Sequence, residues 1–275
     1  MKCQAIYPVG TSRNGGSAIG ITICIITSLF NVMSNSTLVY SLVKLKLLHK
    51  ATFIFYFFMT LSDLLIAAFL QPMVSYIETV SKQSCTITDI VGQFLALTLC
   101  EFSGLMITLV AIDRYYQIVL VQNYVTFMSK SKALVLVLLA AIICTIVGTV
   151  SVIASFWLFI YEFLLFLSVS NAMILLTVCI TYLKGYRELH SRVTASNRAI
   201  EIRIARHIAA LLVAMSVCYI PTFAAQPLWV YSKYKAKHGP STTVTLFVSS
   251  VAPLVIVNSI LNTIILNKTA ILCLT

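Results

Sequence analysis

The sequence predicts an all-α membrane protein, a bundle of seven transmembrane helices with an extracellular N-terminus and a cytosolic C-terminus. Of the 275 residues, 60% are apolar and only 10% are charged, against about 25% charged residues in an average soluble domain. The Lys and Arg residues fall in short stretches between long tracts that contain neither. Most of these tracts exceed the roughly 20 apolar residues that one transmembrane helix needs.

The limits of the helices follow from where the basic residues stop. Tract 133–183 is long enough for two spans, so we expect a tight turn at Ser155-Phe156-Trp157. A short extracellular N-terminus, 1–17, precedes the first span, and a short cytosolic tail, 268–275, follows the last. The seven expected spans are 18–43, 52–79, 88–119, 131–154, 158–186, 203–231 and 242–267.

The orientation follows from the distribution of basic residues. Seven spans place the termini on opposite sides, and one side collects 13 of the Lys and Arg residues against 6 on the other. Loops rich in Lys and Arg stay in the cytosol, so that side is cytosolic. The net charge of +11 therefore reflects orientation and contact with anionic lipid, and no hydrophilic recognition fold suggests nucleic-acid binding.

The cysteines and histidines do not indicate a metal site or an enzyme. Most of the eight cysteines lie inside apolar tracts without metal-ligand spacing, and the four histidines lie in loops or at helix ends. No cofactor is expected. Cys3 and Cys85 are the only cysteines clearly outside the cell, where they either form a disulfide or remain two thiols. No cleavable signal peptide is expected, so the first span acts as the anchor.

Polar side chains inside the expected spans need a partner or a purpose, because a charge there costs about 2.5–3.5 kcal/mol. If they converge, they form one buried cluster around a carboxylate that can hold water or a small cation. Alternatively, each Asn or Ser bonds only a neighbouring backbone carbonyl. The residues concerned are Asn35, Asp63, Glu101, Ser103, Asn258, Ser259 and Asn262.

Two further features suggest a moving part. Asp113-Arg114-Tyr115 ends the third span, where Arg114 is neutralised by its own neighbour and available to another acceptor if the helix ends separate. Pro221 in the sixth span removes a backbone hydrogen bond, so it is either a pivot or a static kink.

Five motifs occur in the order and on the spans of one receptor family. They are Asn35, Ser62-Asp63-Leu64-Leu65, Asp113-Arg114-Tyr115, Cys218-Tyr219-Ile220-Pro221 and Asn258-Ser259-Ile260-Leu261-Asn262. Together they make the chain resemble the rhodopsin-like (class A) G-protein-coupled receptors over nearly its whole length. Within that class it is most similar to the branch that holds the melanocortin, adenosine, cannabinoid and lysophospholipid receptors. Asp89 and the nearly absent loop between spans four and five resemble melanocortin receptors most.

The resemblance implies a multi-pass receptor of the plasma membrane that activates a heterotrimeric G protein when the sixth helix moves outward at Pro221. Its extracellular ligand would be a peptide, amine, nucleoside or lipid. Glu201, twenty residues before Pro221, stands where many of these receptors carry an acid that bonds the Arg of the third helix. The resemblance therefore implies that Glu201 holds Arg114 in the inactive state. Sodium or water would be held by Asp63, Ser103, Asn258 and Asn262.

The resemblance also suggests a ligand pocket between the third, fifth, sixth and seventh spans. Its expected contacts are Asp89, Leu97, Cys100, Glu101, Tyr219, Phe223 and Gln226. Glu101 either pairs with a ligand amine or is a protonated acid that bonds a neighbouring helix.

Departures from the family pattern keep two alternatives open. Tyr219 stands where the family has Trp, the helix-seven Pro and Tyr are replaced in Asn262-Thr263-Ile264-Ile265-Leu266, and the C-terminal amphipathic helix is missing. A degenerate or truncated receptor with weak coupling is therefore one alternative. The other is a seven-helix transporter or proton-conducting protein with Asp63 and Glu101 as relay carboxylates, which leaves Arg114 and Glu201 unexplained.

Overall fold

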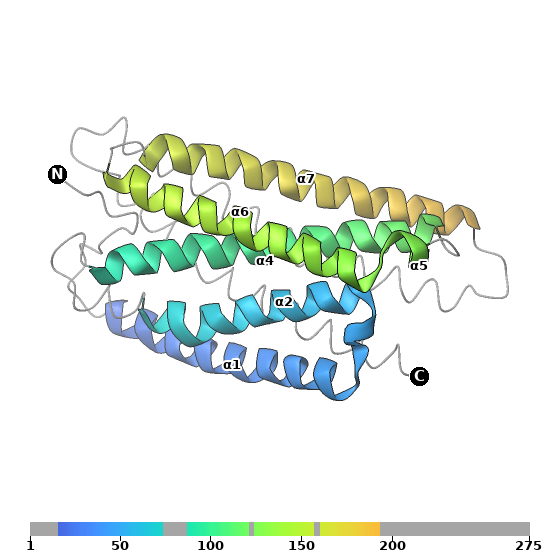
Figure 1. Cartoon of the computed structure of the whole chain (residues 1–275). Coiled ribbons are helices and arrows are strands. Elements are labelled where there is room, and N and C mark those ends of the chain that lie inside the picture. The colour runs from blue at the N-terminus through green and yellow to red at the C-terminus, as the bar shows by residue number, and fades with distance from the viewer. Residues whose placement is uncertain (1–15, 74–86, 121–123, 157–159, 193–275) are drawn as a thin grey trace.

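The computed structural model describes residues 16–73, 87–120, 124–156 and 160–192, which form helices joined by short turns (Figure 1). Three short segments, η1 (Leu47–His49), η2 (Ile66–Leu70) and α5 (Tyr124–Phe127), connect or extend the long helices. The long helices are α1 (Gly16–Lys44), α2 (Ala51–Leu65), α4 (Ile87–Leu120), α6 (Lys130–Phe156) and α7 (Ile160–Arg192).

The long helices begin and end close to where the Lys/Arg-free tracts place them. α1 and α4 differ by at most two residues at either end from the spans expected at 18–43 and 88–119. The tract 133–183 is divided between α6 and α7, with the break in the region expected for the tight turn. The spans expected at 203–231 and 242–267 lie outside the described residues, as do both chain termini.

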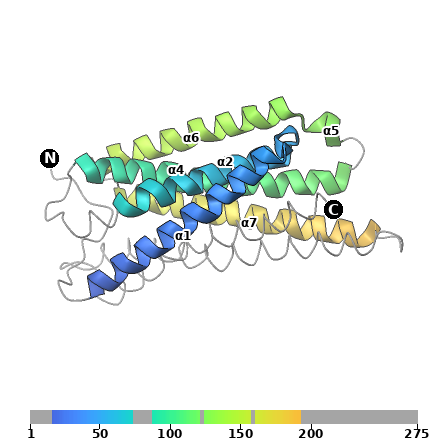
Figure 2. The same ribbon diagram turned by 90° about the horizontal axis from the view of Figure 1, so that it is seen from below.

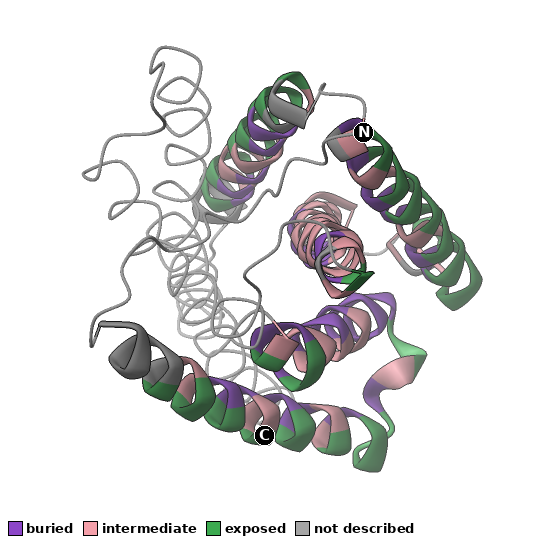
Figure 3. Cartoon of the chain, turned by 90° about the vertical axis from the view of Figure 1, so that its left-hand side faces the viewer, coloured by how far each residue is buried: buried purple, intermediate pink, exposed green. Residues whose placement is uncertain are grey.

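The described part of the chain is that of a membrane protein. Four helical stretches are long and apolar enough to cross a bilayer: Ala51–Met73, Ile90–Gln117, Lys130–Ala154 and Leu165–Glu188. On α6, large apolar side chains such as Leu138 and Ile146 are 60% and 57% exposed. Exposed residues follow the outer sides of the helices, whereas buried ones turn inwards (Figure 3). Because so much apolar surface would be costly in water, we assign these outer faces to lipid.

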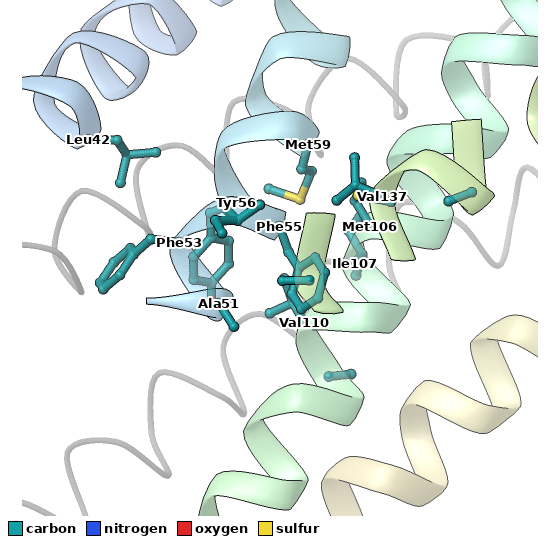
Figure 4. Close-up of a cluster of buried hydrophobic side chains, with 14 of the residues drawn as sticks. Leu42, Ala51, Phe53, Phe55, Tyr56, Met59, Met106, Ile107, Val110 and Val137 are labelled. Atoms are coloured by element: carbon teal, nitrogen blue, oxygen red, sulfur yellow. The ribbon is translucent and has the colours of Figure 1, made fainter. Parts of the chain in front are cut away.

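α4 is the central helix of the described bundle and packs against α2, α6 and α7, while α1 crosses α2 at an angle (Figure 2). A buried apolar cluster lies between these helices, and its fully buried members include Phe55 and Met106 (Figure 4). The cluster includes Val110 and Ala111 of α4, so it packs directly beside Asp113-Arg114-Tyr115.

A glycine sets the distance between α4 and α6. A Cβ atom added to Gly148 would lie 2.1 Å from Thr98 Oγ1, 3.1 Å from the Phe94 carbonyl oxygen and 3.2 Å from the Phe94 ring. Nearby, Gln93 Nε2 of α4 donates a hydrogen bond of 2.8 Å to the Ser151 carbonyl oxygen of α6. The two helices therefore approach closely because residue 148 has no side chain.

The second span widens into a π-helical turn at η2, and its cause is visible in the sequence. The Gln71 N–H bonds the Ile66 carbonyl, five residues back, instead of the Ala67 carbonyl. Pro72, the next residue, has no N–H to offer, so the helix itself leaves Ala67 O without a donor. Ser28 of α1 supplies one, because its Oγ donates to Ala67 O at 2.6 Å.

Replacing Ser28 by Ala is expected to destabilise the bundle by about 1–3 kcal/mol, because it leaves a buried carbonyl without its donor. The measurement is the melting temperature of the purified protein in detergent. Ser41→Ala is the matched control, since the Ser41 hydroxyl bonds only Thr37 O of its own helix at an exposed position. Equal melting temperatures for the two variants would refute this role of Ser28.

Candidate functional site

The first part of the candidate site surrounds Asp113, a fully buried carboxylate near the end of α4. Its Oδ2 accepts hydrogen bonds from Thr52 Oγ1 of α2 and from Gln117 Nε2, the latter at 3.0 Å. Its Oδ1 accepts one from the Tyr124 hydroxyl of α5. Because a buried charge is costly unless it is bonded, these three donors explain how the carboxylate is accommodated.

Tyr124 joins α5 to this carboxylate. Burial, followed by the neighbouring Asp113, raises the pKa of the Tyr124 phenol to about 12, so the hydroxyl remains a donor at physiological pH. The Phe127 ring lies 4.7 Å from the Tyr116 ring, centroid to centroid, and Lys132 Nζ donates to Phe127 O at 2.9 Å. α5 is thus held against the same end of α4.

Arg114 faces the other side of the network. Its Nη1 donates to Gln117 Oε1 at 3.0 Å, and its guanidinium carbon lies 5.9 Å from the centre of the Tyr56 ring. Tyr182 of α7 is buried in the same apolar cluster as Tyr56. The guanidinium therefore lies between α4 and the Tyr56 ring of α2, so a shift of either helix would change its contacts. Glu201, its expected partner, lies outside the described residues.

The second part of the site is the buried pair of Asp63 and Ser103 in the middle of the bundle. Ser103 Oγ of α4 donates to Asp63 Oδ1 of α2 at 2.8 Å, and both side chains are buried. Asn35 Nδ2 donates to Asn31 within α1, at 3.0 Å to the backbone oxygen and 2.7 Å to Oδ1. Two of the four residues expected around a sodium ion are therefore in direct contact. Asn258 and Asn262 lie outside the described residues.

Glu101, the third polar element, is directed towards α7. Its Oε1 accepts a hydrogen bond of 2.8 Å from Asn171 Nδ2. Glu101 lies two residues before Ser103, the α4 residue that bonds Asp63, so the two carboxylates lie at a similar level of the bundle. A bond from the neighbouring helix is the arrangement expected of a structural Glu101, although the same carboxylate is half-buried and could also face a ligand.

The remaining residues expected in the ligand pocket are only partly described. Leu97 and Cys100 lie on α4 and are half-buried. Asp89 belongs to the first turn of α4, and its side chain is not described. Tyr219, Phe223 and Gln226, like Pro221 and the Cys3–Cys85 pair, fall outside the described residues.

Several residues of the site are not apparent from the sequence. Thr52, Gln117 and Tyr124 are found only through their bonds to Asp113, and Asn171 only through its bond to Glu101. Polar residues inside an apolar span are a visible signal for Asn171, but they do not reveal the partner. Pro72 is the one visible signal for the π-helical turn.

Comparison with known proteins adds a family. Residues 34–163, just under half of the chain, match the model of the 7 transmembrane receptor (rhodopsin family). The match runs from α1 into α7 and contains Asp63, Glu101, Ser103 and the Asp113 network. No curated protein matches the chain. The family match supports a membrane receptor that signals through G proteins, in a class that is generally not enzymatic.

Proposed function

We propose that the chain is a rhodopsin-like receptor that binds an extracellular ligand and activates a heterotrimeric G protein through an outward movement of its sixth helix. The observation that carries this proposal is the Asp113 network within the region that matches the receptor family. It holds Asp113 with donors from α2 and α5 and leaves Arg114 between α4 and α2. Release of Arg114 would free its guanidinium to donate hydrogen bonds to the C-terminal helix of a Gα subunit.

In this proposal a ligand acts by binding one arrangement of the helices more tightly than the other. It enters from the extracellular side, contacts the α4 face that carries Leu97 and Glu101, and favours outward movement of the sixth helix at Pro221. Sodium or water between Asp63, Ser103 and the helix-seven asparagines favours the inactive arrangement. The melanocortin-like branch is supported by the sequence motifs, and the ligand class remains a peptide, amine, nucleoside or lipid.

The transporter alternative assigns Asp63 and Glu101 to a proton relay. The contacts favour the receptor, because Asp63 bonds Ser103 while Glu101 bonds Asn171, so each has its own partner. A relay also gives no role to a buried Asp113 that is bonded by donors from two other helical elements.

Replacing Glu201 by Ala is expected to raise basal G-protein activation several-fold, because Arg114 would lose the acid that holds it in the inactive state. The measurement is ligand-independent signalling, normalised to receptor at the cell surface. Glu162→Ala, an acid in the first turn of α7, is the control and should leave basal signalling unchanged. If Glu201→Ala reaches the surface and signals like the parent chain, Glu201 is not the lock.

A further inference from the structure

Glu101 is an acid inside the membrane for which the chain supplies no positive side chain at the same depth. A carboxylate in hydrocarbon is costly unless it is paired with a cation or protonated. An ionised Glu101 therefore takes its counter-charge from outside the chain. Lys, Arg and His are all absent from the apolar tracts 14–43, 51–81, 83–113, 133–183, 208–232 and 239–267.

Asn171 of α7 holds one oxygen of this carboxylate and leaves the other available. Asn171 is buried, and its Nδ2 donates to Glu101 Oε1 at 2.8 Å. The second oxygen, Oε2, accepts no hydrogen bond from the described residues. Unlike Thr98 Oγ1 on the same helix, Oε2 is not enclosed by the surrounding protein. Asn171 thus fixes the direction of the carboxylate, while Oε2 remains accessible.

The half of α4 that carries Glu101 is incompletely covered. Every residue from 94 to 102 is half-buried, although α4 is the central helix, whereas Ser103, Met106 and Asp113 further along are buried. Glu101 lies 14 residues after Ile87, the first residue of α4, which is about 21 Å along the helix. A group that reaches Glu101 from that end of the bundle therefore has to be slender.

We propose that the ligand of this receptor carries a single protonated amine that pairs with Glu101 Oε2, and that Asn171 is the positioning residue for this contact. The inference rests on the proposed function, because it names the class of ligand that the proposed receptor binds. An ammonium group can donate to one oxygen, whereas a guanidinium bonds a carboxylate best through both. Since Asn171 already occupies Oε1, the geometry favours an amine over a guanidine.

The test measures binding to the purified full-length protein in detergent, from the rise in melting temperature that each probe causes. The probes are phenethylamine, tyramine and tryptamine, each beside its neutral alcohol analogue and its guanidine analogue. We expect at least one amine to bind about 10- to 100-fold more tightly than its alcohol, the range for a hydrogen bond to a charged group. Its guanidine analogue should bind more weakly than the amine.

Variants separate a ligand contact from a purely structural role. Glu101→Gln keeps an acceptor for Asn171 but removes the charge, so the amine should lose its advantage over the alcohol. Glu101→Asp keeps the charge and should retain part of that advantage. Asn171→Ala frees Oε1, so the guanidine should gain on the amine, which a loss of stability alone would not cause. Glu162→Gln, at an exposed acid in the first turn of α7, is the control and should bind like the parent chain.

Each contrary outcome would overturn the proposal. If no amine binds more tightly than its alcohol, Glu101 is a neutral structural acid. An advantage that survives Glu101→Gln would place the amine elsewhere, and an unchanged ratio of amine to guanidine binding in Asn171→Ala would remove the positioning role. The assay contains no G protein, so intact amine binding without signalling would refute the proposed receptor function and leave this contact standing.

Discussion

Replacing Arg114 by Ala should abolish G-protein activation while the protein still reaches the cell surface. The guanidinium is the only part of Asp113-Arg114-Tyr115 that can donate several charged hydrogen bonds to a Gα subunit. Hydrogen bonds to charged groups contribute about 1.5–3 kcal/mol each, so activation should fall at least tenfold. Cell-surface staining and G-protein activation in the same cells provide the measurement.

Two further variants separate this effect from misfolding and from loss of charge. Arg114→Lys keeps the charge but loses the planar guanidinium, so its activation should also fall. Arg187→Ala removes an exposed Arg from α7, at the same end of the bundle, and should signal normally. Undiminished activation in Arg114→Ala would exclude the proposed mechanism.

Replacing Gly148 by Ala should lower the stability of the bundle, whereas the same change at Gly104 should not. The new Cβ would meet Thr98 Oγ1 at 2.1 Å and the Phe94 backbone oxygen at 3.1 Å, so α4 and α6 would have to separate. Overpacking of this kind costs about 1–3 kcal/mol, which corresponds to a fall of roughly 2–12 °C in melting temperature. Melting of the purified protein in detergent measures it.

The chain offers both a control and a rescue for this variant. A Cβ at Gly104 would meet nothing within 4 Å, so Gly104→Ala should not lower the melting temperature. Thr98 Oγ1 is buried without a hydrogen-bond partner among the described residues, so Thr98→Ala costs little and removes the nearest clash. The double variant Gly148→Ala/Thr98→Ala should recover part of the loss. If Gly148→Ala melts like Gly104→Ala, close approach of α4 and α6 does not depend on the missing side chain at residue 148.

The sequence predicts the helices well because their limits are a property of single segments. A stretch without Lys or Arg marks the interior of a span. The spans drawn from this pattern, and from the turn expected at Ser155-Phe156-Trp157, agree with α1, α4 and α6 to within two residues at each end. α7 is the exception, since it continues to Arg192, beyond the expected limit at 186. Helices can extend into water once they have left the lipid.

The site was less predictable, because its contacts depend on the register between helices. The sequence indicates that Asp63 needs a partner and offers Ser103 among the polar residues of the spans. It does not indicate that Asn171 bonds Glu101 or that Thr52 bonds Asp113. A sequence shows that a polar side chain is in lipid, whereas only packing shows which neighbouring helix satisfies it. The receptor motifs predict roles for Asp113 and Arg114, but they do not reveal Thr52 and Tyr124 as the donors that bond Asp113.

The central claim is that Arg114 transmits activation to a G protein, and guanine-nucleotide exchange tests it most directly. The purified chain would be reconstituted in lipid nanodiscs with each class of heterotrimeric G protein, beside Arg114→Ala and Glu201→Ala. We expect exchange by the parent chain on at least one G protein, more with Glu201→Ala and none above background with Arg114→Ala. Exchange at background level for both the parent chain and Glu201→Ala, together with ion or proton flux through the nanodisc protein in liposomes, would contradict it.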